Sequence, residues 1–210
     1  MTPEERTAKW TAYYERTAGE PPRKSLLRAL ELHGDAPPGL AVDLGCGGGR
    51  DTLELLERGW SVVAVDREPA ATERVEAIVP EAHADRLRTL AEPLETVEIP
   101  SCLLVNASYS LPFCAPDRFA AMWSRVREAI VPGGRFTGQI FGDRDEWRDN
   151  PELTFHTRDE TEALFDGFEI EDFTELDEDG LTSMGEAKHW HVFTVIARKP
   201  DAPARPLGDD

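Results

Sequence analysis

The sequence predicts an α/β fold in which a parallel sheet carries helices on both of its faces. From residue 40 onward, short apolar runs alternate with amphipathic segments, which is the pattern of strands joined by crossover helices. The first run, over 40–44, leads into a glycine-rich turn at 45–49, and a second run over 61–65 ends in Asp66. Because parallel sheets bind ligands beyond the carboxyl ends of their strands, we expect the binding site at that turn.

The turn after the first predicted strand is rich in glycine because the chain must reverse tightly and leave its backbone open to a ligand. Gly45 and Gly47 allow the positive φ angles that such a turn requires. A helix predicted over 49–58 starts directly behind them and presents its free amide groups to the same ligand. The cofactor-binding residues expected on this turn and helix are Gly45, Cys46, Gly47, Arg50 and Asp51.

Two acids, Asp43 and Asp66, indicate which kind of cofactor binds there. Asp66 follows the first strand by about 20 residues, where a carboxylate reaches a ribose diol, and Arg67 lies next to it. A dinucleotide fingerprint that begins at Gly45 requires glycine at the position of Arg50, and Asp43 is an unfavourable neighbour for a pyrophosphate. An acid at this place suits a cationic ligand better. S-adenosylmethionine fits, because it carries an ammonium and a sulfonium and has no phosphate.

The segments DLGCGGGRD at 43–51 and VVAVD at 62–66 resemble the first two motifs of the class I S-adenosylmethionine-dependent methyltransferases, in the branch of tellurite-resistance-type and related small-molecule enzymes. The segments VNASYSLPF at 105–113, VPGGRFTGQIFG at 131–142 and KHWHVFTVIARK at 188–199 continue the resemblance. It implies a Rossmann-like sheet of seven strands, the last of them antiparallel. It also implies S-adenosyl-L-methionine as the cofactor and in-line methyl transfer to a small-molecule acceptor.

Two other functions remain open from the sequence. A protein that binds S-adenosylmethionine without transferring its methyl group, such as a sensor or accessory subunit, needs the same turn and the same acids. A nicotinamide-dependent oxidoreductase uses the same kind of sheet, but Arg50 and Asp43 disfavour it.

Methyl transfer requires mainly that the donor carbon and the acceptor atom are held about 3 Å apart and aligned. A general base is needed only where the acceptor must lose a proton.

The resemblance also implies a lid over the cofactor. Helices predicted over 3–18 and 23–33 belong to a leading segment, 1–38, that lies over the cofactor site in the family. Tyr14 and Arg23 in this segment are candidates to meet the carboxylate of the donor. The alternative is a ring that packs in the core and a base that faces solvent.

Two further sets of cofactor contacts are implied after the third and fourth strands. Glu92 follows a strand predicted over 87–91, where the family often has an acid that binds the adenine amine. A plain surface acid is the alternative. Asn106 and Ala107 follow a strand predicted over 102–105, and we expect their backbone groups to contact the amino-acid part of the donor.

The candidate catalytic residues are Tyr109, His189 and His191. Tyr109 ends the segment 106–109, which resembles the Asn-Pro-Pro-Tyr box of amino-methylating enzymes but lacks both prolines, so chemistry on nucleic-base amines is disfavoured. Tyr109 either borders the acceptor or packs as an ordinary ring. His189 and His191 share one face of the last predicted strand, where one of them can serve as a general base. No third ligand lies at a suitable spacing, so we expect no metal.

The second half of the chain is expected to complete a single domain over 1–199, followed by a disordered tail at 200–210. The turn between the last two strands is expected at 177–180, and the polar loop 142–153 either covers the acceptor or faces solvent. The further expected elements are a helix over 119–130, a strand over 136–141, a helix over 158–166 capped by Thr157 and Glu160, and antiparallel strands over 168–176 and 190–198.

The composition limits the partners of the protein. A formal net charge of −18 argues against nucleic acid, because Lys and Arg must neutralise phosphates in such complexes. No apolar run approaches the roughly 20 residues that cross a bilayer, so we expect no membrane partner. The polar amino end lacks the apolar core of a secretion signal, and three cysteines form neither a disulfide framework nor a zinc pattern. We therefore expect a cytoplasmic protein; the sequence does not indicate its oligomeric state.

Overall fold

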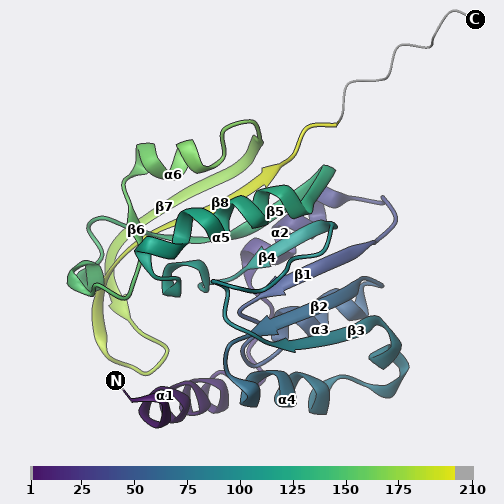
Figure 1. Cartoon of the computed structure of the whole chain (residues 1–210), viewed down its shortest axis with the longest axis horizontal. Helices are drawn as coiled ribbons and strands as arrows, with labels where there is room; N and C mark the ends of the chain where they lie inside the picture. The colour runs from purple at the N-terminus through teal and green to yellow at the C-terminus, as the bar shows by residue number, and fades with distance from the viewer. Residues whose placement is uncertain (1, 202–210) are drawn as a thin grey trace, which may run out of the picture.

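A mixed sheet with helices on both faces forms the molecule (Figure 1). The computed structural model describes residues 2–201, and the strand order is β3-β2-β1-β4-β5-β8-β7, with β6 added beside β5. The strands are β1 (Leu40–Leu44), β2 (Ser61–Asp66), β3 (Leu87–Ala91), β4 (Cys102–Ala107), β5 (Ile130–Gly142), β6 (Phe155–His156), β7 (Glu169–Leu181) and β8 (Ala187–Arg198).

The order of the strands reverses beside β1, which separates β2 from β4. Strand β1 pairs in parallel with both neighbours, so Asp43 lies opposite Ala64 on one side and Asn106 on the other. The pairs β2–β3 and β4–β5 are also parallel. Open α/β sheets bind ligands beyond the carboxyl ends of their strands at such a reversal. The sheet therefore gathers Asp43, Asp66 and Asn106 at the end where a ligand is expected.

Strand side chains alternate between two hydrophobic cores, as the two-residue period of a strand requires. Val42 and Val63 belong to the core that includes α5, whereas Ala41 and Val62 belong to the core of α2, α3 and α4. The longer helices are α1 (Pro3–Arg16), α2 (Lys24–His33), α3 (Arg50–Glu57), α4 (Pro69–Ile78), α5 (Pro116–Ala129) and α6 (Arg158–Leu164); short turns η1 (Glu81–Arg86), η2 (Leu111–Phe113) and η3 (Glu146–Asp149) connect them.

The predicted Rossmann-like sheet is confirmed, including its antiparallel end. Strand β8 runs antiparallel to both β5 and β7, and only the two-residue β6 exceeds the seven expected strands. The capping box of Thr157 and Glu160 at the start of α6 is present. Helix α5 begins three residues earlier than predicted, because Pro116 occupies its first turn, where a missing N–H costs nothing. Strand β5 begins six residues earlier than the strand predicted over 136–141, and residues 132–134 lie within it beside a shift in the β4–β5 register.

The hairpin between β7 and β8 is longer than predicted, and the turn expected at 177–180 is wrong. All four of these residues pair with β8, and the chain reverses instead around Gly185, whose φ is 85°. Acids and a glycine fit inside this strand because β7 forms the edge of the sheet, where charged side chains can face solvent. The misplaced turn matters because the longer hairpin reaches the predicted lid.

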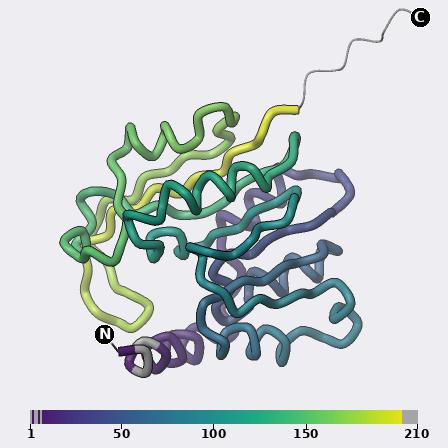
Figure 2. The backbone as a smooth tube through the Cα atoms, viewed as in Figure 1, coloured from purple at the N-terminus to yellow at the C-terminus, as the bar shows by residue number. Residues whose placement is uncertain are grey.

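The tip of this hairpin lies beside α1 (Figure 2). Arg16 near the end of α1 donates from Nε to the carbonyl of Ser183, at 2.5 Å. Thr2 and Glu5 form a capping box that starts α1. Within residues 2–201, every helix is too short or too polar to span a bilayer. The tail predicted from residue 200 falls mostly at 202–210, outside the described residues.

Candidate cofactor and acceptor site

A cavity of about 880 Å³ lies at the carboxyl ends of the parallel strands, between α1 and the β7–β8 hairpin. It combines backbone from the turn after β1 with side chains from the ends of β2 and β4. The sequence-predicted residues that line it are Tyr14, Arg23, Asp43, Gly45, Cys46, Gly47, Arg50, Asp51, Asp66, Arg67 and Tyr109. The predicted residues that do not line it are Glu92, Asn106, Ala107, His189 and His191.

The glycine-rich turn is held against β2 by two backbone hydrogen bonds. The N–H groups of Gly45 and Cys46 donate to the carbonyl of Val65 at 2.7 and 2.9 Å. Gly45 has a φ of 76°, and a Cβ at this position would lie 2.3 Å from Cβ of Ser110. Both the left-handed backbone and the close neighbour require glycine here, so the turn leaves bare backbone at the cavity.

Asp66 is fixed next to this turn. Its carboxylate accepts hydrogen bonds from the N–H groups of Gly47 and Glu68, both at 3.0 Å, and from the Tyr14 hydroxyl at 3.4 Å. Burial raises the pKa of Asp66, while the backbone donors oppose this rise. Burial and the nearby Asp66 charge also raise the pKa of Tyr14, which therefore stays a hydrogen-bond donor. A carboxylate offers about four lone-pair positions. Asp66 already accepts three hydrogen bonds, so one position remains for a ligand hydroxyl.

A second acidic group lies at the junction of β1 and β4. Asp43 is buried and accepts from the Thr52 hydroxyl at 2.6 Å and from Nδ2 of Asn106 at 2.8 Å. Nδ2 of Asn106 also donates to Asp51, at 3.0 Å. The Ser108 hydroxyl donates to the same Asp51 oxygen at 2.8 Å. Asn106 thus acts behind the cavity surface, by joining the two acids.

In the described part of the structure, no basic side chain neutralises the negative charge of Asp43 and Asp51. Burial and the neighbouring Asp51 charge raise the pKa of Asp43 to about 7. Asp51 accepts the backbone N–H of Arg23 at 2.8 Å, but among the described side chains no Lys or Arg side-chain nitrogen lies within 4.0 Å of the carboxylates of Asp43, Asp51 or Asp66. A cationic ligand would relieve this repulsion, since an opposite charge stabilises the ionised carboxylates.

Arg23 and Tyr109 stand together at the cavity. The guanidinium carbon of Arg23 lies 4.7 Å from the centre of the Tyr109 ring, and its Nη2 lies 3.4 Å from the Tyr13 hydroxyl. Among the side chains that the structure describes, Arg23 has no carboxylate partner, so its charge is free to meet an anionic group of a ligand. Tyr109 has a φ of 54°, and its N–H donates to Oε1 of Gln139 at 3.1 Å. Burial raises the pKa of Tyr109, which makes its phenol a poor base.

Aromatic rings form a large part of the cavity lining. We call the set Trp10, Tyr13, Tyr109, Phe113, Phe141, Trp147 and Trp190 the aromatic wall; all seven line the cavity. Sequence reasoning identified Tyr109 and placed Trp147 in the polar loop, but it did not foresee the wall. Its rings come from five separate segments, and only the strand order and the long hairpin bring them together.

A buried ion pair supports the wall from behind. Nζ of Lys188 lies 2.5 Å from both carboxylate oxygens of Asp145, and both side chains are almost fully buried. The same ammonium lies 3.8 Å from the Trp190 ring centre, 4.4 Å from that of Trp147 and 5.5 Å from that of Phe141. Burial lowers the pKa of Lys188, and Asp145 opposes this change. The pair therefore fixes the positions of three rings of the wall.

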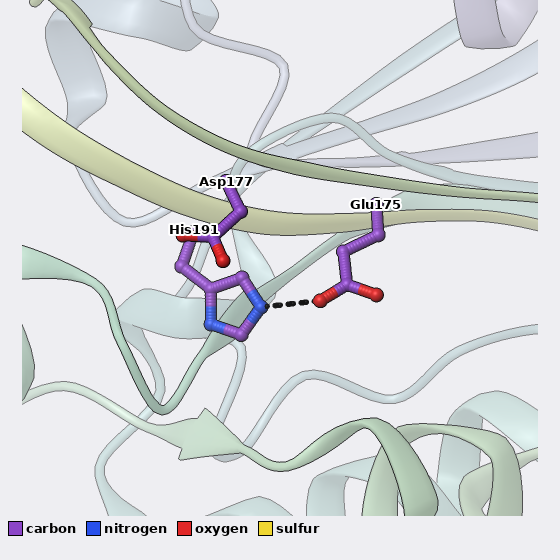
Figure 3. Close-up of side chains that lie close together, drawn as sticks. All are labelled: Glu175, Asp177 and His191. Atoms are coloured by element: carbon purple, nitrogen blue, oxygen red, sulfur yellow. Dashed lines mark hydrogen bonds and ion pairs between the residues drawn. The ribbon is translucent and has the colours of Figure 1, made fainter.

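The two predicted histidines lie on the hairpin, outside the cavity lining. His189 bonds to Asp179 at 2.7 Å and to Asp177 at 2.9 Å, and these bonds raise its pKa. His191 is buried; its Nδ1 accepts the N–H of Arg144 at 3.0 Å, and its Nε2 lies 2.9 Å from Glu175 (Figure 3). Both imidazoles are thus engaged with neighbours on the hairpin and the following loop.

His191, Glu175 and Asp177 bring potential metal-ligating atoms within 4.8 Å of one another (Figure 3). This cluster could not be predicted from the sequence, because the two acids lie on the neighbouring strand β7 and only the antiparallel register brings them to His191. The guanidinium of Arg144 already supplies a cation here, since its Nη2 lies 2.6 Å from Glu175 and 2.7 Å from Asp177. The cluster is therefore complete as a hydrogen-bonded ion-pair network.

The remaining predicted residues lie around the edge of the site. Glu92 is exposed, whereas Leu94, two positions further on, lines the cavity. Arg67 forms an ion pair with Glu95 at 2.8 Å. Ala107 is buried in β4, next to Asn106.

Comparisons with known proteins agree with this geometry. A family model described as a methyltransferase domain matches residues 41–134. An uncharacterised methyltransferase of Synechocystis is 35% identical over 107 residues, which make up 51% of this chain and 49% of that protein. The chain thus spans about half the length of this curated relative.

Two solved structures share the fold. TehB from Haemophilus influenzae superimposes with a TM-score of 0.68 at 17% identity, over 82% of this chain and 61% of that one. The 1,6-didemethyltoxoflavin-N1-methyltransferase of Burkholderia thailandensis, solved with S-adenosylhomocysteine bound, gives a TM-score of 0.64 at 22% identity, over 96% and 92% of the two chains.

The strand order, the glycine turn and the two acids define a class I S-adenosylmethionine-dependent methyltransferase fold. The turn and both acids lie within the residues that the domain model matches. The matched residues 41–134 make up less than half of the chain, so the comparisons support a methyltransferase domain with the class I fold, whose donor is S-adenosylmethionine. The resemblance stated from the sequence is confirmed.

Proposed function

We propose that the protein transfers the methyl group of S-adenosylmethionine to a small-molecule acceptor by in-line displacement. The observation that carries this proposal is the pairing of Asp66 with the unneutralised acids Asp43 and Asp51 across a bare glycine turn, in one cavity. One acid offers a lone pair to a ribose hydroxyl, and the other two suit a cationic donor. The match of residues 41–134 to a methyltransferase domain model supports the same activity.

The residues present fit the parts of the donor. We propose that Asp66 binds the ribose. The backbone of the turn, Gly45–Gly47, would lie in close contact with the donor. Asp43 and Asp51 provide the negative field for its positive charges, with Asn106 holding both acids in place. Arg23 lines the cavity and has no carboxylate partner among the described side chains, so we assign it to the donor carboxylate. Arg50 lines the cavity at the start of α3, whose free amide groups face this turn.

S-adenosylmethionine supplies an activated methyl carbon on a sulfonium when it is bound. The protein has to align this carbon with the acceptor atom, and alignment of this kind lowers barriers by roughly 7–11 kcal/mol. Helix α1 and the β7–β8 hairpin both line the cavity and can hold the two molecules between them. Tyr109 stays protonated because of its raised pKa, so it would position the acceptor rather than remove a proton.

The leading helices are part of this proposal. Tyr14 and Arg23 line the cavity from α1 and from the start of α2, which supports the role of residues 1–38 as a lid of one domain over 1–199. We also propose a small-molecule partner and no nucleic acid, in keeping with the net charge of −18. Three buried free cysteines fit the reducing conditions of the cytoplasm, where we propose that the protein acts.

Calorimetry with S-adenosylmethionine and with S-adenosylhomocysteine tests the proposal. We expect both to bind the wild-type protein. Asp66→Ala should weaken binding by roughly 10- to 100-fold, because a charged hydrogen bond to the ribose is worth about 1.5–3 kcal/mol. Asp66→Asn, which keeps the shape, should weaken it less. Asp172→Ala on β7 is the matched control, since this acid lies outside the cavity.

The outcomes separate the possible functions. Absence of heat with both ligands would contradict the proposal. Binding of the donor without its consumption, in a screen of phenols, thiols, amines and chalcogen oxyanions, would indicate a binding protein without transfer activity. Tight binding of a nicotinamide cofactor, measured by its fluorescence, would indicate an oxidoreductase instead.

A further inference from the structure

The aromatic wall uses a large part of the aromatic residues of the chain. All three tyrosines and three of the five tryptophans line the cavity, although such side chains usually contribute most to cores. The rings form a continuous series of contacts. Trp10 lies 5.1 Å from Phe113, Phe113 lies 6.1 Å from Phe141, and Phe141 lies 6.1 Å from Trp190, measured between ring centres. A surface of this kind favours a ligand with a flat apolar face.

The β7–β8 hairpin and the end of α4 also present apolar side chains to water at this cavity. In the described part of the chain, five large hydrophobic residues are exposed, and four of them line this one cavity: Ile78, Leu176, Leu181 and Met184. Leu181 near the hairpin tip is 68% exposed. Exposed apolar side chains gathered at one place mark a binding surface, because a ligand would remove them from water. The fifth, Ile170, lies outside the cavity.

The charges around the wall argue against a charged acceptor. Glu178 and Glu186 line the hairpin side of the cavity and oppose an anion there, whereas the basic residues of the lining, among them Arg23, lie on other elements. Lys188 already lies over the rings of Trp190, Trp147 and Phe141, so their capacity to bind a cation is used by the protein itself. An uncharged, electron-rich ring can stack on these residues without meeting either effect.

The size of the cavity admits a second molecule beside the donor. Pockets for drug-sized ligands range from about 300 to 1,000 Å³, and this cavity, at about 880 Å³, lies near the upper end. The donor site at Asp66 and the glycine turn takes one part of it. The part between the wall and the hairpin remains for the acceptor.

We propose that the acceptor is an uncharged planar aromatic or heteroaromatic molecule, held between the aromatic wall and the apolar side chains of the β7–β8 hairpin. This inference rests on the proposed methyltransferase function. The lone pair of a ring-borne oxygen or nitrogen forms the new bond to the methyl carbon. The carbon–sulfur bond breaks with its electron pair left on sulfur, and the proton of the acceptor passes to water.

Titration calorimetry with three probes of similar size tests the preference. These are 2-naphthol, its saturated counterpart decahydro-2-naphthol, and the cation N-methylquinolinium, each added to protein saturated with S-adenosylhomocysteine. We expect 2-naphthol to bind about tenfold more tightly than the saturated alcohol, because several rings stack on it. We also expect it to bind more tightly than the cation. Equal binding of the saturated alcohol, or tighter binding of the cation, would overturn the proposal.

Matched variants locate the probe. Phe113→Leu and Trp147→Leu each remove a ring from the aromatic wall. Each should weaken the binding of 2-naphthol by about fivefold. Phe168→Leu makes the same kind of change outside the cavity and should leave the affinity as it is. The affinity for S-adenosylhomocysteine reports whether each variant is folded. If wild-type protein fails to bind S-adenosylhomocysteine, the proposed function fails, whereas 2-naphthol titrated into the protein alone still tests the aromatic preference.

Discussion

Replacing Asp43 by asparagine should stabilise the unliganded protein while weakening its binding of the donor. The pKa of Asp43 is raised from 3.8 to about 7 by burial and by Asp51. Below about pH 4 the Asp43 carboxyl is protonated in both the folded and the unfolded protein, so it does not lower the free energy of unfolding. As the pH rises from about 4 to about 7, the unfolded chain ionises and the folded protein does not, so stability is lost. Above about pH 7 the loss is complete.

The size of the change in the free energy of unfolding follows from the difference between the two pKa values of Asp43. Each pKa unit corresponds to about 1.4 kcal/mol, so the full cost of Asp43 is on the order of 4 kcal/mol. Between pH 5 and pH 8 the advantage of Asp43→Asn over wild type should grow by about 2–3 kcal/mol. The amide fits the site, because Thr52 can accept a hydrogen bond as well as donate one, and Asn106 can still donate to the amide oxygen.

Urea unfolding at the two pH values measures this effect. Asp172→Asn, a substitution of a partly exposed acid on β7, is the control and should show little change in its advantage with pH. An equal advantage of Asp43→Asn at pH 5 and pH 8 would refute the reasoning, and so would destabilisation at pH 8. Calorimetry on the same variant at pH 8, where Asp43 is ionised, should show weaker binding of S-adenosylmethionine, because the negative charge of Asp43 is lost.

Two further substitutions test the turn and the support of the wall. Gly45→Ala should abolish donor binding and destabilise the protein, because its Cβ would lie 2.3 Å from Cβ of Ser110. Gly34→Ala, with a φ of 65° but no atom within 4 Å, should cost only the backbone strain of about 1–2 kcal/mol in urea unfolding. Lys188→Met should lower the free energy of unfolding by about 3–5 kcal/mol, since it leaves Asp145 buried without its partner. The double variant Lys188→Met/Asp145→Leu should recover much of that loss; no recovery would contradict the role of the pair.

The donor side could be predicted from the sequence because its parts are local. A strand, a glycine turn and an acid at the end of the next strand occur in one short stretch, 40–66, and parallel pairing brings Asp43 and Asp66 to the same edge. The periodicity of apolar residues likewise predicted most of the strands and helices. Asn106 could be placed beside these acids only through its strand, which pairs with β1.

The acceptor side could not be predicted because its residues are distant in sequence. Lys188 and Asp145 are 43 positions apart, and neither lies in a pattern that indicates a buried pair. The segment 177–180 has the composition of a turn, yet strand pairing continues through it because its side chains lie at an edge. This difference of a few residues extends the hairpin and places Leu181 at the cavity.

A crystal structure with S-adenosylhomocysteine bound tests the central claim most directly. We expect the ribose hydroxyls within hydrogen-bond distance of the Asp66 carboxylate, with the sulfur directed toward Tyr109 and the rest of the aromatic wall. A nucleoside seated away from Asp66, or a ligand phosphate bound against the turn at Gly45–Gly47, would contradict it.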